Sequence, residues 1–411
     1  MAVKTWAGRA SSVSQVTKVT FSAVGSHTYS VTINGKTVTY TSTTSSLADI
    51  IDGLIASWEA SAEPEHAELI AAQRLEPTLV GLQLTATASG VPHTITASAS
   101  SGTATVTEVT AASGPNFWNV AANWSGGTLP SAADDLVLEN SSVPILYGLA
   151  DTTNYASLTI RASFTGSIGL PVTNDLGYPE YRTRFLTLGN GSGSMALTIG
   201  EGVGIGAQRI YIDFNDNTGT VSVFSTQQNV VSGHPVQIYG LDSSSVVRIY
   251  GGSVLLDDPT SASVNTIDII ERQGANARAD VYVTPRVSWT AITTSGGTLL
   301  VESSGSSLTA RESASVTVSK ASAIPAVKVG SRARINWESS AGIATKLTVE
   351  PNGVMDFGRV ATSKTVAAVD MNTSGTLLDP SDRITFTTGI TLIGCRLADV
   401  SLDLGFGVTV T

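Results

Sequence analysis

The spacing of apolar and polar positions changes along the chain. Residues 16–112 combine strand-like runs with one amphipathic stretch. From about residue 146 onward, short β-type runs follow one another without helical periodicity. This pattern predicts a mainly β protein in four parts. The parts are an N-terminal arm (1–15), a small α+β module (16–112), a Trp-containing entry segment (113–145) and a long β domain (146–411).

The first strong strand signal in the module is the run HTYSVTINGKTVTYTS. Tyr29, Val31 and Ile33 alternate with polar residues up to Asn34-Gly35, and apolar residues alternate again after it. Asn-Gly adopts the positive φ angles of a type I′ turn, so the run predicts a tight β-hairpin.

One convincing helix follows, in LADIIDGLIASWEA, with Ser46 or Ser45 as its cap. Its apolar residues fall on one stripe. A weaker segment, EPEHAELIAAQRL, predicts a short second helix. The runs LVGLQLTATASGVPHTITASA and GTATVTEVTAA predict two or three more strands, so the module is expected to be a hairpin, a helix and a second hairpin.

The long β domain consists of short runs such as SLTI, RIYI, VQIYG, ADVYV, TLLVE and SVTVS. They recur about every 11–20 residues, with Gly, Asn, Asp and Ser between them. Many short strands without fixed hairpin turns are typical of a right-handed parallel β-helix, a solenoid whose coils vary in length. A tandem of β-sandwiches is the alternative, although sandwiches have fewer strands and more regular turns.

Composition supports a stacked β architecture more than a compact enzyme. The 411 residues are 42% hydrophobic but only 14% charged, and Ser, Thr, Asn and 39 glycines fill the polar positions. The net charge is −10 and no basic stripe is present, which disfavours binding to nucleic acid or to anionic membranes.

Cysteine content and hydropathy indicate the cellular compartment in which the protein is made. Cys395 is the only cysteine, so no intrachain disulfide forms, and its apolar neighbours predict a buried side chain. The N-terminus lacks the apolar core of a signal peptide, and no run approaches the ~18 apolar residues of a membrane span. We therefore expect synthesis in a cytoplasm without export by that route.

The sequence contains no motif typical of metal, nucleotide or nucleophilic chemistry. The four histidines, His27, His66, His93 and His234, show no zinc-ligand spacing, and no GxSxG motif occurs. The glycine-rich run Gly200–Gly206 lacks the Lys-Ser/Thr of a phosphate loop and is interpreted as a solenoid turn. No cofactor, metal or catalytic residue is predicted.

Paired carboxylates are the remaining candidates, because glycoside hydrolases use two of them. The candidate pairs are Asp213 with Asp216, Asp257 with Asp258, Asp268 with Glu271, and Asp379 with Asp382. Three pairs lie in Gly/Asn/Pro-rich turns, where we expect Asx-type capping, access to water and ordinary ionisation. The fourth, Asp268 with Glu271, is expected at outward positions on a strand. The Asp-rich turn FNDNTG has oxygen ligands suited to calcium, but no GGxGxD-type repeat accompanies it, so a calcium site is not predicted.

Two segments resemble parts of bacteriophage proteins. YSVTINGKTVTYTSTTSSLADIIDGLIASW is similar to a small hairpin–helix–hairpin module of phage virion proteins. WNVAANWSGGTLPSAADDLVLEN resembles the entry motif of many bacterial and phage β-helices. With YPEYRTRFLTLG and the C-terminal LADVSLDLGFGVTV, the chain resembles a family of uncharacterised phage and prophage virion structural proteins. The resemblance implies a place in a virion and transfers no active site.

These considerations predict a non-enzymatic capsid decoration or head spike protein that binds other virion proteins, the major capsid protein first. The arm is expected to fold on attachment, with Trp6 as the anchor buried by the partner and Lys4 and Arg9 pairing with its acidic groups. The solenoid is expected to project outward and to form a homotrimer. The alternatives are a tail fibre or receptor-binding spike, with a host surface glycan as partner, and a polysaccharide-degrading spike.

Overall fold

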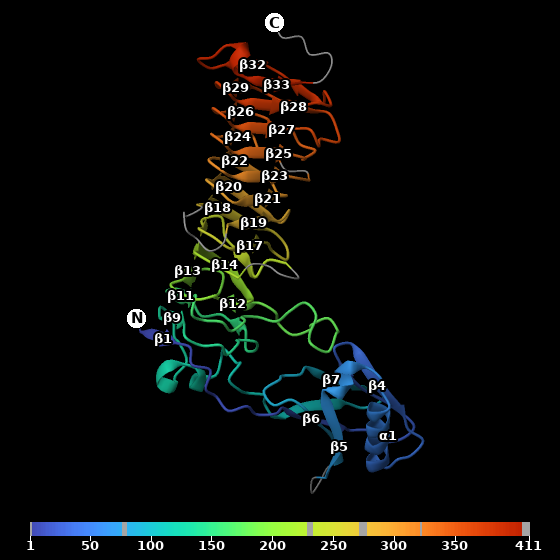
Figure 1. The fold of residues 1–411 in the computed structure, drawn as a ribbon. Coiled ribbons are helices and arrows are strands. Elements are labelled where there is room, and N and C mark those ends of the chain that lie inside the picture. The colour runs from blue at the N-terminus through green and yellow to red at the C-terminus, as the bar shows by residue number, and fades with distance from the viewer. Residues whose placement is uncertain (1, 76–79, 228–232, 271–277, 321–322, 405–411) are drawn as a thin grey trace.

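The molecule is an elongated β-solenoid with a small module beside its base (Figure 1). The computed structural model describes residues 2–75, 80–227, 233–270, 278–320 and 323–404. Strands make up 45% of the chain and helices 7%, and about 12 solenoid turns follow residue 135. The predicted mainly β fold, with a parallel solenoid after a small α+β module, is confirmed.

The N-terminal module consists of two antiparallel sheets around one helix. One sheet has the order β5-β6-β2-β8 and the other the order β4-β3-β7, and α1 packs against β4, β5 and β6. The elements are β2 (Val16–Phe21), β3 (Thr28–Ile33), β4 (Lys36–Thr41), α1 (Leu47–Glu59), α2 (Pro64–Ala67), β5 (Leu69–Leu75), β6 (Val80–Ala86), β7 (Ile95–Ala99) and β8 (Ala104–Thr110).

Local sequence signals account for most of this module. Asn34 and Gly35 have φ angles of 49° and 73°, and β3 pairs with β4 as a hairpin, as predicted. Ser46 caps α1, and its side chain accepts a hydrogen bond from the Asp49 amide. The predicted second helix is mostly wrong: α2 is four residues long, and the chain then enters β5, which pairs with β6.

The solenoid contains two parallel sheets, in which each strand pairs with the corresponding strand one coil away. Sheet 1 contains β1 (Val3–Thr5), β9 (Asp135–Leu138), β11 (Ser157–Arg161), β13 (Ser194–Glu201), the second half of β14 (Ile210–Val223), β16 (Val246–Ile249), β18 (Ala262–Ile269), β20 (Val287–Thr294), β22 (Gly305–Ala310), β24 (Ala326–Val329), β26 (Lys346–Val349), β29 (Val369–Met371) and β32 (Ile390–Leu392).

Sheet 2 runs along the other side of the same core. It contains β10 (Ala150–Asp151), β12 (Leu186–Leu188), the first half of β14, β15 (Val236–Leu241), β17 (Ser253–Leu256), β19 (Asp280–Val283), β21 (Thr298–Val301), β23 (Ser315–Val318), β25 (Arg334–Trp337), β27 (Val354–Asp356), β30 (Thr376–Leu378) and β33 (Ser401–Asp403). A short third pair, β28 (Lys364–Val366) with β31 (Ile384–Phe386), lies near the C-terminal end.

Aliphatic side chains stack in columns inside the solenoid. One column of sheet 1 starts at Leu136 and a second at Leu138, and each gains one residue per coil. The first column contains Leu136, Leu158, Leu197, Val221, Val247, Ile267, Ile292, Leu308, Val327, Leu347, Val369 and Ile390. Because side chains alternate along a strand, every second residue enters this core.

Coil length varies while the register is kept. Neighbours in the first column are separated by as few as 16 residues, from Ile292 to Leu308, and by as many as 39, from Leu158 to Leu197. The longest coil carries a loop that reaches the N-terminal module (Figure 1). The solenoid starts at β9, earlier than the predicted boundary at residue 146, so the entry segment supplies its first strand.

Two further expectations concern the surface of the chain. Cys395 is half-buried rather than buried, and its sulfur lies 3.6 Å from the Met371 carbonyl oxygen. In the described part of the chain, no helix has both the length and the apolar character needed to cross a membrane.

Candidate functional site

The N-terminal arm forms part of the solenoid. β1 pairs in parallel with β9, and Trp6 is only 2% exposed. The Trp6 ring lies 6.4 Å from that of Trp118 and 5.3 Å from that of Trp124. The prediction that Trp6 is an anchor buried by a partner, in an arm that folds only on binding, is therefore wrong: the chain's own first coil already buries it.

The entry motif holds the arm in place. The Asn123 carbonyl accepts hydrogen bonds from the Ala7 and Gly8 amides, and its side-chain oxygen accepts one from Ala10. Ser125 accepts from the Thr5 amide, and Asp134 from the Ala2 amide. Hydrogen bonds from Ser131 and Ala2 lower the pKa of Asp134 to about 2. The motif NWS…DD is thus the docking site of the arm.

The other two predicted attachment residues lie nearer the surface. The Lys4 ammonium donates a hydrogen bond to the Thr128 hydroxyl. Arg9 is exposed and lines a cavity of about 310 Å³, together with Ser125 and Glu139. An attachment role for these two side chains stays a prediction.

The histidines do not assemble a metal or triad site. No cluster of three or more His, Cys, Asp or Glu side chains that could hold a metal ion occurs among the described residues. His66 is a core residue that contacts Ser61 and Lys36 of the module. His234 contacts Ser253, but that hydroxyl is buried and donates to Asp280, so it is not presented as a nucleophile.

The predicted capping of local backbone is confirmed for Asp213, Asp258 and Asp379, although Asp213 and Asp216 lie within β14 and Asp257 accepts hydrogen bonds from side chains of other coils. Asp213 accepts a hydrogen bond from the Asn215 amide, Asp258 from Thr260, and Asp379 from Arg383. Asp216 and Asp382 have the positive φ angles of turn residues.

The fourth pair lies on sheet 1. Asp268 occupies an outward position of β18, in register with Arg248 of β16. Its predicted partner Glu271 lies outside the described residues.

The expected access of these carboxylates to water is wrong for three of them. Asp257, Asp258 and Asp379 are buried, because the neighbouring coil covers each turn. Thr284 and Arg286, from the next coil, hold Asp257. Burial opposes its ionisation, but these hydrogen bonds prevail and lower its pKa.

The expectation that Asp213 has an ordinary pKa is also wrong. Burial, followed by the nearby Asp258 and Asp216, raises the pKa of Asp213. Asp213 and Asp257 lie on either side of Tyr239, which is in register with Asp213 and donates a hydrogen bond to Asp257. Two carboxylates with opposite shifts thus occur on one edge of sheet 2.

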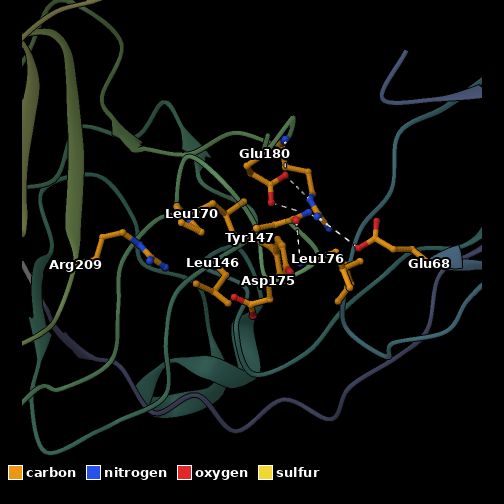
Figure 2. A pocket seen from close by; sticks show the side chains of 12 residues that line it. Glu68, Leu146, Tyr147, Leu170, Asp175, Leu176, Glu180 and Arg209 are labelled. Atoms are coloured by element: carbon orange, nitrogen blue, oxygen red, sulfur yellow. Dashed lines mark hydrogen bonds and ion pairs between the residues drawn. The ribbon is translucent and has the colours of Figure 1, made fainter. Parts of the chain in front are cut away.

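The most concentrated polar cluster joins the N-terminal module to the solenoid. We call it the junction cluster: Glu68 and His93 from the module, and Tyr178, Glu180, Tyr181 and Arg182 from the loop between β11 and β12. Arg182 binds Glu180 through two nitrogens, at 2.8 and 3.2 Å, and lies 3.8 Å from Glu68 (Figure 2). The Tyr178 hydroxyl donates to Glu68 over 2.6 Å.

Burial controls the ionisation of this cluster. Burial, then the Arg182 charge, lowers the pKa of His93 to about 4. Burial alone would lower the pKa of Arg182, but the Glu180 hydrogen bond outweighs it and raises that pKa. Burial raises the pKa of Tyr181 as well. At neutral pH the cluster therefore holds a neutral imidazole beside a fixed ion pair.

A cavity of about 260 Å³ adjoins the junction cluster. Glu68 lies at one side and Arg209 at the other, with Leu146, Leu170 and Leu176 between them (Figure 2). Pockets that bind drug-sized ligands typically have volumes of ~300–1,000 Å³. This cavity is somewhat smaller, so it can accommodate a small molecule.

The sequence interpretation missed the junction cluster. All four of its solenoid residues, Tyr178, Glu180, Tyr181 and Arg182, fall in the segment YPEYRTRF. The available signal was the density of charged and aromatic residues there, in a chain that is only 14% charged.

Comparisons of the chain with family models, with curated proteins and with solved structures returned no match in any of the three.

Proposed function

We propose that the chain is a non-enzymatic structural protein of a bacteriophage particle, in the class of capsid decoration or head spike proteins. Its N-terminal region would contact the particle, with the major capsid protein as first candidate partner, and the solenoid would project away. A tail fibre or receptor-binding spike would use the same architecture at another position. The virion location rests on the sequence resemblance.

The observation that carries a structural role is the coupling of the module to the solenoid. Glu180 and Arg182 form a largely buried ion pair, with side chains 1% and 10% exposed, and Glu68 of the module contacts Arg182 and Tyr178. Moving the module away from the solenoid would take the Glu68 carboxylate from the Arg182 guanidinium and the Tyr178 hydroxyl and leave these groups without that partner. The module and solenoid would therefore move together, as a projecting element fixed at one end requires.

Immunogold labelling of purified particles tests the location. Phage would be induced from cells that carry the gene and labelled with antibodies against this chain. Gold on the head supports the decoration or spike role, and gold on the tail supports the fibre alternative. Unlabelled particles, with the protein present in the cell lysate, would contradict the virion proposal.

We also propose that the protein is a homotrimer. The outward positions of sheet 1 begin with small polar residues, Thr159, Thr198 and Ser222, and continue in register with Arg248 and Asp268, so lateral packing of copies could pair these charges. Gel filtration with light scattering on the full chain should give three times the mass of 42.3 kDa. A folded monomer at micromolar concentration would contradict this assembly.

A polysaccharide-degrading spike is the second candidate, because Asp213 and Asp257 have opposite pKa shifts. Their strands are separated by two strand spacings, roughly 9–10 Å. This approaches the ~6.5–9.5 Å between the carboxyl groups of inverting hydrolases. Asp257 is buried and paired with Arg286, which favours the structural role.

We expect the purified protein to leave capsular polysaccharide and lipopolysaccharide of the host intact. Size-exclusion chromatography of the polysaccharide before and after incubation checks this. Shortening by the wild-type protein, abolished in Asp213→Asn but retained in the exposed control Asp382→Asn, would establish the enzymatic candidate instead.

A further inference from the structure

The cavity beside the junction cluster contains hydrogen-bond donors that lack protein acceptors. Asn174 accepts two backbone hydrogen bonds through its side-chain oxygen, from Leu176 and Tyr178. This fixes the orientation of the amide. Its nitrogen is buried and has no partner. A buried donor without an acceptor is destabilising, so it marks a place where a ligand atom would be favourable.

Arg209 supplies a second set of donors to the same cavity. Its Nε donates to the Gly169 carbonyl over 3.0 Å, and its guanidinium extends toward Leu146 and Leu170 (Figure 2). Within the described ranges, no carboxylate lies within ion-pair distance of Arg209. Burial lowers the pKa of Arg209, with a further contribution from Arg184.

Arg184 reinforces the positive charge at this side. Its guanidinium and that of Arg209 lie 5.7 and 5.8 Å from the centre of the same ring, Tyr211. The Arg184 Nε is buried without a hydrogen-bond partner. The Arg184 charge contributes to the lowered pKa of Arg209, and an oxyanion bound at Arg209 from the cavity would offset that repulsion.

The opposite side of the cavity is acidic. Glu68 and Glu180 are engaged there by the junction cluster. Asp175 is exposed at the cavity edge between the two sides, and its charge partly offsets the lowering of the Arg209 pKa. Leucines line the space between the acidic and basic sides. A complementary ligand therefore has an anionic group for the Arg209 guanidinium, hydroxyl donors for the free Asp175 carboxylate and a compact body with apolar faces.

We propose that this cavity binds an acidic sugar unit, with its oxyanion against Arg209 and the Asn174 amide and its hydroxyls toward Asp175. Carboxylated and sulfated sugars share this chemistry. The volume of about 260 Å³ limits the bound part to a small unit of a longer chain. Binding here does not depend on attachment to a particle.

The test is titration of the full chain with glucuronate, glucose 6-sulfate, glucose and inorganic sulfate, followed by saturation-transfer NMR and calorimetry. We expect one or both acidic sugars to bind at least about tenfold more tightly than glucose and inorganic sulfate. The sugar that binds better identifies the anionic group. Equal binding of glucose, binding of inorganic sulfate alone, or no binding at millimolar concentration overturns the proposal.

Two variants locate the site. Asn174→Asp keeps the oxygen that accepts the Leu176 and Tyr178 amides and replaces the free donor by a negative charge, so it should weaken binding at least about tenfold. Arg209→Gln should weaken it similarly, and the exposed Arg311→Gln is the matched control. Thermal unfolding confirms that each variant is folded. Unchanged affinity in folded Asn174→Asp, or an equal loss in Arg311→Gln, places the ligand elsewhere and contradicts the proposal.

Discussion

At the base of the solenoid, β1 and three tryptophans cover the first coil, whereas at the far end the last described strands leave their apolar side chains half-buried. Trp6, Trp118 and Trp124 are each 2% exposed, and each indole nitrogen donates a hydrogen bond. At the other end, Leu392 and Leu402 only partly enter the core.

The difference shows that a coil depends on its neighbour for burial. A repeat in a solenoid cannot bury its apolar face alone, so terminal repeats need a cap. At the base, the chain's own N-terminus supplies the cap and the entry motif fixes it by hydrogen bonds. The base should therefore be more sensitive to mutation than the far end.

The largest expected effect is that of Trp6→Ala. Removing this ring from a fully packed cluster leaves a cavity, and such substitutions cost about 3–5 kcal/mol. Urea denaturation should show the loss in the free energy of unfolding. The control is the neighbouring Val3→Ala, since Val3 is 63% exposed. A Trp6→Ala protein as stable as the Val3→Ala protein would show that the cap is dispensable.

The next largest expected effect is a difference in the stability lost when one leucine is truncated at each end of the solenoid. Leu138 and Leu392 occupy the first and last positions of one inward column, aliphatic except at Thr294 and linked in register through every coil between them. Leu138→Ala should cost about 2–5 kcal/mol, as a buried leucine does, and Leu392→Ala less than half of that. Denaturation of both variants measures the difference, and equal losses would mean that the far end is as well covered as the base.

The smallest expected effect is the pH dependence of the free energy of unfolding that arises from His93 in the junction cluster. The pKa of His93 is about 4 in the folded protein and about 6.5 in an unfolded chain. Between these values the unfolded state binds the proton and the folded state does not, so acidification favours unfolding. Stability should fall by about 1 kcal/mol between pH 7 and 5.5.

His93→Gln isolates this contribution, because glutamine does not titrate. The groups facing His93 are Glu68, Tyr181, Arg182 and Glu180. Chemical denaturation across this pH range should give a flatter profile in the variant than in the wild type. The same slope in both proteins would assign the pH dependence to other groups, such as His234, whose pKa is also lowered by burial.

The solenoid could be predicted because its signal repeats in every coil. Val236-Gln-Ile-Tyr-Gly and Asp280-Val-Tyr-Val each alternate inward aliphatic and outward polar or aromatic residues, and the structure places both in sheet 2. The tight turn at Asn34-Gly35 could also be predicted, because this dipeptide favours the positive φ angles that the structure shows there.

The missed features depend on contacts between distant parts of the chain. The residues of β5 have high helix propensity, but pairing with β6 prevailed, as Leu69 and Ala71 alternate with exposed Ile70. Asp257 belongs to a turn by sequence, yet Arg286 of the next coil binds it. Neither the docking of Trp6 nor the joining of Glu68 to Arg182 has a local signature.

The orientation of the solenoid strands also determines how the molecule would respond to force. Hydrogen bonds between coils run along the long axis, and each coil contributes only short ladders to sheets 1 and 2. A pull on the C-terminal end would load the outermost ladder first and leave those beneath it at rest. The protein would lengthen one coil at a time, in steps set by coil length, until the tension reached the tryptophan cap at the base.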